Sequence, residues 1–177
     1  MKIKGLYTLL LVMLVSVVIA SLWDSLPIIK NSVNAVLNPT FGFLIQTNLH
    51  LGFIIIVLLV TFITTLIQKY GTNQQALKAI KDEQKAMQDE MKKFQNDPKK
   101  MLEIQKRQLE KIPETMELTM KPLIYTAIPF ILLIRWFSDT FKNLNEPEFF
   151  GFMSWFWAYL LLAVIFSIIL RKIMKVY

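Results

Sequence analysis

The stretch MKKFQNDPKK (residues 91–100) is a polar turn in the middle of a chain that is 54% hydrophobic. Its Asn96-Asp97-Pro98 triplet is typical of a helix start, because Asn or Asp caps the first free N–H groups and proline suits the first turn. Long segments rich in Lys, Glu and Gln flank the turn on both sides. We therefore expect a polar helical hairpin at the centre of the chain.

Apolar residues in both flanking segments recur at the three- and four-residue spacing of a coiled coil. They are Leu77, Ile80, Met87, Met91 and Phe94 in the first segment, with Gln84 in the gap, and Leu102, Leu109, Ile112 and Met116 in the second, with Gln105 in the gap. The pattern predicts an antiparallel coiled-coil hairpin over residues 69–118, with residues whose numbers sum to 196 lying opposite each other. Pro113 is expected to end or bend the second helix.

Outside the hairpin, three stretches lack charge over the roughly 20 residues that a helix needs to cross a bilayer. They are residues 5–22, 51–68 and 149–170, and residues 122–134 form a shorter apolar stretch. We predict an all-α integral membrane protein. Its three-helix core comprises residues 49–68, 119–138 and 149–171, with an outer loop at 139–148 and a tail at 172–177.

Residues 1–24 are predicted to form an amino-terminal transmembrane anchor. The basic start and Val18-Ile19-Ala20 also fit a signal peptide, so cleavage within residues 1–20 stays open. The following segment, 25–48, places Ile29, Val33, Val36 and Leu37 on one side of a helix. We expect this outer segment to lie flat at the membrane interface.

Basic residues predict the orientation of the chain. With the amino terminus in the cytoplasm and four crossings, 17 of the 20 Lys and Arg residues lie inside, as the positive-inside rule requires. The hairpin and both termini are then cytoplasmic, and the protein is a multi-pass protein of the plasma (cell) membrane. Trp23, Trp136, Trp155 and Trp157 fall near the outer helix ends, where aromatic residues are typical of the interface.

Polar residues in the predicted core helices gather in their cytoplasmic halves. Such residues usually face protein or water rather than lipid, so we predict a groove that is open to the cytoplasm and closed on the outside. Thr and Ser hydroxyls can also bond their own helix carbonyls, which is the alternative reading for each residue. The predicted lining residues are Thr61, Thr64, Thr65, Gln68, Thr119, Tyr125, Thr126, Arg135 and Ser167.

Arg135 lies near the outer end of the second core helix, and no acidic residue lies within the three predicted core spans. Its side chain either reaches the outer headgroups or points into the groove, where water or a bound protein would have to supply its partner. The span from Pro122 to Ser138 measures about 24 Å. It is shorter than the roughly 30 Å hydrocarbon core, which favours local thinning of the bilayer.

Five of the nine methionines lie between Met87 and Met120. Flexible methionine side chains suit varied apolar partners, and Met116 and Met120 are the predicted contacts for a client protein. The chain has no cysteine and one histidine, and it lacks a Gly-rich phosphate loop and a Ser/His/Asp set. We therefore predict no catalytic residue, no metal, no cofactor and no sequence-specific nucleic acid partner.

Four short motifs resemble those of the archaeal YidC-like proteins, which are relatives of the YidC-type insertases, and of the third subunit of the endoplasmic-reticulum membrane protein complex. The motifs are Gln68-Lys69-Tyr70-Gly71-Thr72-Asn73-Gln74, Asn96-Asp97-Pro98-Lys99-Lys100-Met101, Met120-Lys121-Pro122-Leu123 and Ile169-Leu170-Arg171-Lys172-Ile173-Met174-Lys175-Val176-Tyr177. The resemblance covers about residues 45–177.

This resemblance implies a three-helix core and a hydrophilic groove that lowers the barrier for inserting small or short-tailed membrane proteins. Bacterial relatives often carry an Arg in the first core helix, but residues 49–68 contain none, so a polar groove is expected instead of a charged one. The implied partners are nascent membrane proteins and membrane lipids, and the coiled coil is a candidate contact for a ribosome. A membrane-anchored scaffold and a channel subunit are the alternative functions.

Overall fold

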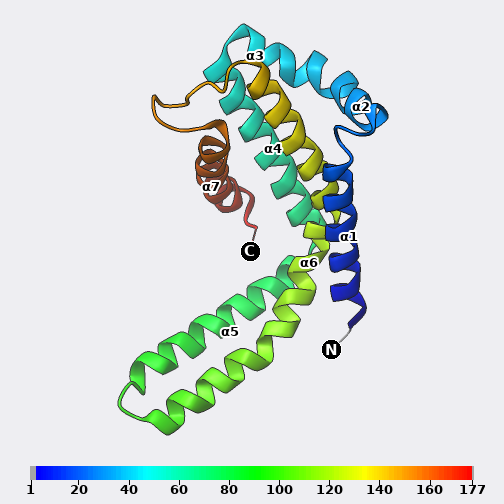
Figure 1. Cartoon of the computed structure of the whole chain (residues 1–177). Coiled ribbons are helices and arrows are strands. Elements are labelled where there is room, and N and C mark those ends of the chain that lie inside the picture. The colour runs from blue at the N-terminus through cyan, green and yellow to red at the C-terminus, as the bar shows by residue number, and fades with distance from the viewer. Residues whose placement is uncertain (1–2, 177) are drawn as a thin grey trace.

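The computed structural model describes residues 3–176, which form helices joined by short connections (Figure 1). Residues 1, 2 and 177, at the ends of the predicted anchor and tail, lie outside this range. The all-α prediction is confirmed. The elements are α1 (Ile3–Ser21), α2 (Pro27–Leu37), a π-helical turn η1 (Asn38–Gly42), α3 (Phe43–Thr47), α4 (Leu49–Gly71), α5 (Gln74–Lys93), α6 (Pro98–Asn143) and α7 (Trp155–Met174).

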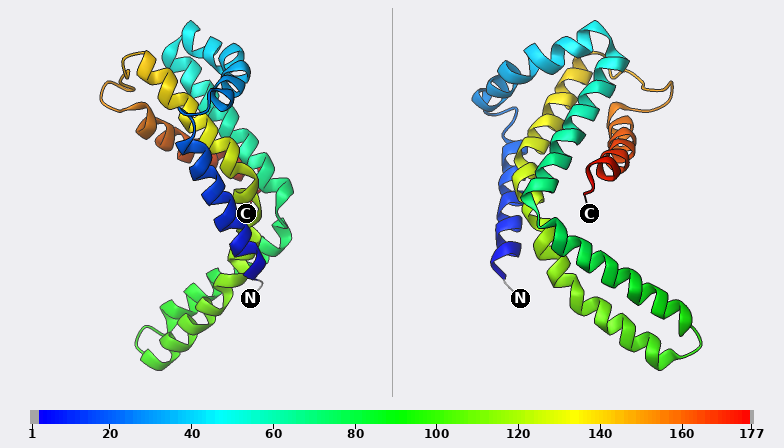
Figure 2. Two further views of the ribbon diagram at one scale, coloured as in Figure 1. Left: turned by 45° about the vertical axis from the view of Figure 1, so that its right-hand side comes forward. Right: turned by 180° about the vertical axis from the view of Figure 1, so that it is seen from behind.

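Three helical segments are long and apolar enough to cross a membrane: α4, the Pro122–Asn143 part of α6, and α7. Helix α4 packs against α7, and α1, a shorter apolar helix, packs along α6. As a result α1 and α7 lie on opposite sides of the α4–α6 pair (Figures 1 and 2). The hairpin extends from one end of this bundle, which we call the hairpin side. The α2–η1–α3 run covers the other end, which we call the α2 side.

The α2–η1–α3 run sits close to the bundle because α3 and α4 touch through their backbones. A Cβ atom at Gly52 would lie 2.2 Å from the carbonyl oxygen of Leu44, so only glycine fits there. The Asn48 side chain caps α4 by accepting from the Leu51 N–H at 3.0 Å. Ile29, Val33 and Leu37 of the predicted apolar side pack against the core, which ties the outer segment to the bundle.

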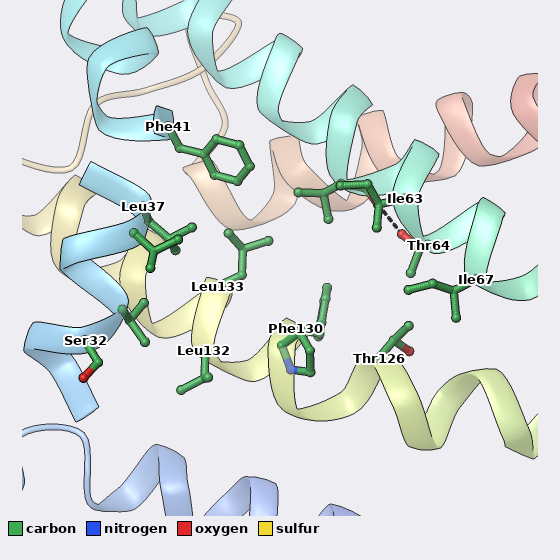
Figure 3. A pocket seen from close by; sticks show the side chains of 14 residues that line it. Ser32, Leu37, Phe41, Ile63, Thr64, Ile67, Thr126, Phe130, Leu132 and Leu133 are labelled. Atoms are coloured by element: carbon green, nitrogen blue, oxygen red, sulfur yellow. Dashed lines mark hydrogen bonds between the residues drawn. The ribbon is translucent and has the colours of Figure 1, made fainter. Parts of the chain in front are cut away.

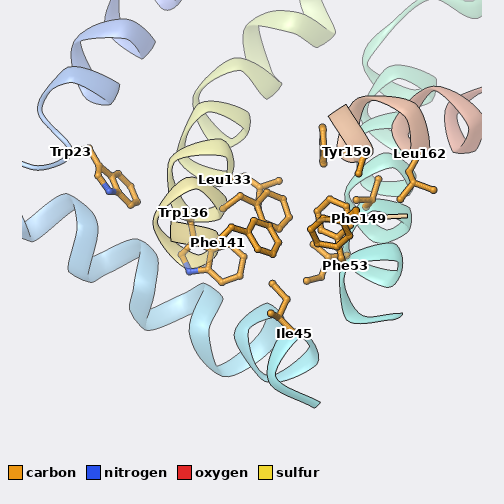
Figure 4. Close-up of a cluster of buried hydrophobic side chains, with 13 residues drawn as sticks. Trp23, Ile45, Phe53, Leu133, Trp136, Phe141, Phe149, Tyr159 and Leu162 are labelled. Carbon is orange, nitrogen blue, oxygen red and sulfur yellow. The ribbon is translucent and has the colours of Figure 1, made fainter. Parts of the chain in front are cut away.

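An aromatic cluster forms the core on the α2 side (Figure 4). Phe53 of α4 lies 4.4 Å from Phe149 of the α6–α7 loop, measured between ring centroids. Phe137 and Phe141 of α6 stack at 5.6 Å. All four rings are essentially buried, and such pairs stabilise a core beyond the area that they bury. This cluster fixes how α6 is rotated relative to α4.

Two of the four tryptophans are buried in this core. Trp23 and Trp136 are 0% and 1% exposed. Each indole N–H finds a partner inside the protein: Trp23 donates to Asp139 at 2.9 Å and Trp136 donates to Asn38 at 2.8 Å. A tryptophan whose N–H is satisfied can be buried without cost from an unpaired donor. Trp157, by contrast, is 63% exposed.

The hairpin caps formed as predicted. The Asp97 side chain accepts from the N–H groups of Lys99 and Lys100, at 3.2 Å each, and Pro98 occupies the first turn of α6. Ion pairs join Arg107 to Glu90 at 3.7 Å and Lys111 to Glu83 at 3.0 Å. Their residue numbers sum to 197 and 194, so the pairing of the two arms is close to the predicted sum of 196.

The contact face is correct for α5 and wrong for α6. Ile80 and Met87 of the α5 seam are 5% and 6% exposed. In the part of α6 that forms the second arm, Ile104 is buried at 2%, whereas the predicted seam is exposed at Leu102, Leu109, Ile112 and Met116. The buried face lies one residue earlier than predicted, a rotation of about 100° for an α-helix.

Of the two outcomes expected at Pro113, an end of the helix is excluded and a bend is left. Helix α6 runs for 46 residues through Pro113, Pro122 and Pro129. Each proline removes only one backbone hydrogen bond, which a long helix can accommodate by bending. Figure 1 shows α6 changing direction where it passes from the hairpin to the bundle. The second arm of the hairpin and the second core span are therefore parts of one continuous helix.

Candidate functional site: a pocket between α2, α4 and α6

A pocket of about 420 Å³ lies between α2, α4 and α6 (Figure 3). Only Ser32, Thr64 and Thr126 contribute polar side chains, so the pocket is mainly apolar, in contrast to the predicted hydrophilic groove. Its apolar lining is Val33, Val36, Leu37, Phe41, Val60, Ile63, Ile67, Pro129, Phe130, Leu132 and Leu133. It lies within the apolar spans of α4 and α6 and is covered on the α2 side by α2 and η1.

Two threonine hydroxyls lie at the end of the pocket nearer the hairpin, one on α4 and one on α6 (Figure 3). Thr64 of α4 donates to the carbonyl of Val60, and Thr126 of α6 donates to the carbonyl of Pro122 at 2.9 Å. Each hydroxyl proton is therefore used within its own helix, while the oxygen keeps capacity to accept a hydrogen bond. An apolar group bound in the pocket would therefore leave neither hydroxyl without a hydrogen-bond acceptor.

The α2 side of the bundle is closed by a charged cluster. Arg135 of α6 donates to Asp24, in the α1–α2 connection, at 2.7 Å, and its guanidinium lies 5.9 Å from the centre of the Trp23 ring. Lys30 of α2 pairs with Asp139 of α6 at 2.6 Å. These contacts hold α2 and the end of α1 against α6.

The partner of Arg135 is thus within the chain, which corrects the expectation that water or a bound protein must supply it. Asp24 lies outside the three core spans, at the end of the predicted anchor, where the chain turns from α1 to α2. Arg135 does not line the pocket. Its Nε atom is buried and has no hydrogen-bond partner among the described residues.

The predicted polar face of α4 is divided by the fold. Thr64 lines the pocket, but Thr61 and Thr65 are buried at 6% and 2% exposure and lie outside it. Their hydroxyls donate to the carbonyls of Val57 and Thr61, at 2.7 Å each. Gln68 accepts from Arg171 of α7 at 2.7 Å. The four polar residues cover too wide an arc of α4 to line one pocket, so they contact different parts of the protein.

The other predicted lining residues also lie outside the pocket. Thr119 is exposed and donates to the carbonyl of Thr115 at 2.9 Å, and Tyr125 is 66% exposed. Ser167 of α7 is partly buried. Of the two predicted client contacts, Met116 is 43% exposed, whereas Met120 is buried at 9%.

Sequence reasoning missed the apolar lining of the pocket because it searched the spans for polar groups only. Val60, Ile63 and Ile67 share a helix face with Thr64 at three- and four-residue spacing. That spacing was available in the sequence. The contribution of α2, including Ser32, was not, because it depends on how the outer segment folds over the bundle.

Within residues 3–176, no group of three or more His, Cys, Asp or Glu side chains is placed to hold a metal ion. The pocket itself contains no titratable side chain. Its chemistry is therefore that of apolar contact and hydrogen-bond acceptance.

The family described as "Integral membrane protein EMC3/TMCO1-like" matches residues 34–147, which is more than half of the chain. This range includes the pocket helices α4 and α6, the hairpin and much of the outer segment. No curated protein and no solved structure matches the chain.

Proposed function

Because the chain belongs to the EMC3/TMCO1-like family of integral membrane proteins, we propose that it is an insertase of the Oxa1/YidC type. Members of this family are non-catalytic insertases or complex subunits. The clients that we propose are small or short-tailed membrane proteins. The pocket between α2, α4 and α6 is the observation that carries this proposal.

The pocket is suited to the costly step of insertion. A polar tail that crosses hydrocarbon loses several kcal/mol for each backbone group left without a partner. The hydroxyl oxygens of Thr64 and Thr126, which line the pocket, can accept hydrogen bonds from N–H groups of such a tail. The apolar remainder of the pocket can receive the adjoining apolar segment, which then leaves into lipid.

In the orientation that we propose, the protein lies in the plasma membrane and its hairpin lies in the cytoplasm. The basic residues concentrated between Lys69 and Lys121 support this orientation through the positive-inside rule. The end of the pocket that carries Thr64 and Thr126 then faces the cytoplasm. The Arg135–Asp24 and Lys30–Asp139 pairs close the outer end, which argues against a continuous channel through one copy of the chain.

The proposed partners follow from this arrangement. Nascent membrane proteins would reach the pocket from the cytoplasm, and membrane lipids would receive them. The coiled-coil hairpin is a candidate contact for a ribosome.

Insertion into vesicles tests the proposal. The purified chain is reconstituted, and a single-span protein with a short polar tail is supplied by cell-free synthesis. Protection of the tail from protease reports insertion. The variant Thr64→Val with Thr126→Val removes the two threonine hydroxyls of the pocket at almost constant volume. Since a net hydrogen bond contributes about 0.5–1.5 kcal/mol, we expect about a tenfold slower insertion.

The matched control is Thr61→Val with Thr65→Val, which removes two hydroxyls from the same helix outside the pocket. We expect this control to insert the client at nearly the unmodified rate. Vesicles with the unmodified chain that protect no more tail than empty vesicles would refute the insertase proposal. Equal losses in both double variants would refute the role of the pocket.

A further inference from the structure

Residues 24–42 cover the end of the pocket that lies on the α2 side, and we call them the cover segment. The segment comprises the end of the α1–α2 connection, α2 and η1. In the proposed orientation this end is the outer one, so a tail that enters from the cytoplasm meets the cover segment before it reaches the outside. The members of the segment that line the pocket are Ser32, Val33, Val36, Leu37 and Phe41 (Figure 3).

A polar tail is poorly accommodated beneath the cover segment. The structure describes the whole segment, and of the side chains that it contributes to the pocket only that of Ser32 is polar. Backbone N–H and C=O groups that stay in apolar surroundings without a partner cost free energy. A tail that is to end outside the membrane therefore needs a way past this segment.

The chain is fixed on both sides of the cover segment. Trp23, directly before it, is fully buried and donates to Asp139 at 2.9 Å. After it, Ile45 of α3 is buried at 4%, and the backbone of α3 lies so close to α4 that only glycine fits at position 52. These two regions would stay in place if the segment between them moved.

Helix α2 itself is packed loosely. None of its residues is buried, and Ile28 and Val36 are 73% and 64% exposed. Elements with few buried apolar contacts open at a low cost in free energy. The connection before α2 also suits a movement, because residues 22–26 are not helical and no side chain caps α2 at Leu26.

The connection after α2 is the π-helical turn η1. The Phe43 N–H bonds there to the carbonyl of Asn38, five residues earlier. Such π-helical turns are rare and occur frequently at functional sites. The side chain of Asn38 accepts from the Trp136 indole at 2.8 Å. The turn therefore combines an irregular backbone, which suits a hinge, with a contact that defines the closed position.

Two ion pairs hold the cover segment against α6. Lys30 pairs with Asp139 at 2.6 Å, and Asp24 pairs with Arg135 at 2.7 Å. The four side chains are between 21% and 71% exposed, and ion pairs that are open to solvent contribute little to stability. The closed arrangement can therefore be left at low cost. Once separated, the four charged groups would lie beside the opened path and attract water to it.

We infer that the cover segment is an outer gate, which the Lys30–Asp139 and Asp24–Arg135 pairs close and which opens when the tail of a client passes to the outside. This inference rests on the proposed insertase function and adds the step by which the tail leaves the pocket. Helix α2 moves away from α6 about the 22–26 connection and η1. A tail that left the pocket sideways into lipid would not need this movement.

Reversible linking of α2 to α6 tests the gate. The chain has no native cysteine, so Lys30→Cys with Asp139→Cys gives two thiols at the positions of an existing ion pair. The purified variant is joined with a short bismaleimide that contains a disulfide, and a reductant cuts the linker in half of the sample before reconstitution. Mass spectrometry verifies both states. Both halves carry the same substitutions, so only the link differs between them.

The vesicle assay then measures protease protection of the short polar tail of a single-span client that has been released from ribosomes. We expect the linked protein to lose tail protection and the cut protein to regain it, because the gate opens only after cutting. The matched control is Glu83→Cys with Lys111→Cys, which replaces an ion pair of 3.0 Å between the two hairpin arms. Linking this control should leave tail protection unchanged.

A second measurement reports gate opening without a client. Leu133→Cys places a single thiol in the pocket, at a position that is 7% exposed. Asp24→Asn with Lys30→Gln removes one charge from each ion pair, and we expect it to speed maleimide labelling of position 133 in detergent. The matched control, Asp89→Asn with Lys92→Gln, neutralises an ion pair of the hairpin and should leave the labelling slow.

A thiol at position 57 distinguishes gate opening from a general loosening of the bundle. Val57 of α4 is fully buried and lies outside the pocket. In a Val57→Cys chain, Asp24→Asn with Lys30→Gln should leave the labelling slow. An equal acceleration at positions 57 and 133 would mean that the whole bundle loosens and would overturn the gate. Unchanged labelling at position 133 would overturn it as well.

The outcomes separate the gate from the proposed function. Equal tail protection by the linked and the cut protein would overturn the gate and leave the insertase intact, with the tail leaving sideways into lipid. An equal loss on linking the hairpin control would also overturn the gate. Faster labelling of position 133 alone, together with no tail protection by any form of the chain, would support the movement of the cover segment and refute the insertase proposal.

Discussion

The two arms of the hairpin carry similar apolar patterns, yet only α5 buries the stripe that its pattern predicts. Helix α5 begins at its own cap, where Asn73 accepts from the Ala76 N–H at 3.1 Å, so it can rotate until Ile80 and Met87 are covered. The second arm belongs to α6, which continues into the bundle. There Phe137 and Phe141 are locked into the aromatic core. A helix shared by two regions takes the rotation that the more strongly packed region requires.

Loss of the aromatic core is expected to have the largest effect on this difference between the arms. Phe137 is fully buried and contacts Phe53, Phe141 and Tyr159. Phe137→Ala should destabilise the protein by about 3–5 kcal/mol, because the cavity cannot be refilled. Thermal unfolding in detergent measures this loss. Phe130→Ala, on an exposed position of the same helix, should cost less than about 1 kcal/mol, and equal losses would contradict the packing described here.

Alanine substitutions within the second arm compare its two sides directly. Ile104→Ala removes a buried side chain and should destabilise the hairpin by about 2 kcal/mol or more. Leu109→Ala removes an exposed one and should change stability by less than about 0.5 kcal/mol. Hydrogen exchange of the α5 amides reports the stability of the hairpin. If Leu109→Ala proved the more damaging change, α6 would have the rotation that its heptad pattern predicts.

A one-residue insertion tests whether the bundle sets the rotation of the arm. An alanine inserted between Glu117 and Leu118 rotates the arm by about 100° relative to the span. The chain has no native cysteine, so Leu109→Cys provides a single site for maleimide labelling. We expect the insertion to slow labelling at this site about tenfold, the factor for a 1.4 kcal/mol difference between exposed and covered states. Ile104→Cys should show the opposite change, and unchanged rates at both sites would contradict the coupling.

The smallest expected effect concerns the ion pair that joins the two arms. The hydrogen bond from Glu83, aided by its charge, raises the pKa of Lys111 above its usual 10.5. The pair therefore contributes to hairpin stability at neutral pH, and this contribution is lost as the pH rises through the raised pKa. Glu83→Gln should reduce the loss of hairpin stability between about pH 9 and 12, where free lysine titrates. If hairpin stability depended on pH in the same way in the unmodified protein and in the Glu83→Gln variant, the ion pair would not stabilise the hairpin.

The site was less predictable than the fold, and the threonines show why. Thr61, Thr64 and Thr65 are equivalent in the sequence, since each lies in the same apolar helix and each bonds its own helix carbonyl. Their different positions arise from which neighbouring helix each one meets. The partner of Arg135 was hidden for a similar reason, because Asp24 is 111 residues away in the chain.

Local pattern was sufficient for the helical class, the membrane spans, the caps and the position of the hairpin turn. These features depend on the hydrophobicity of consecutive residues and on hydrogen bonds within a few positions, both of which can be read from one stretch of chain. The rotation of α6, the closure over Arg135 and the pocket around Thr64 and Thr126 required the folded protein. Each of them is a contact between distant segments, and a helix has only one rotation with which to satisfy all its neighbours.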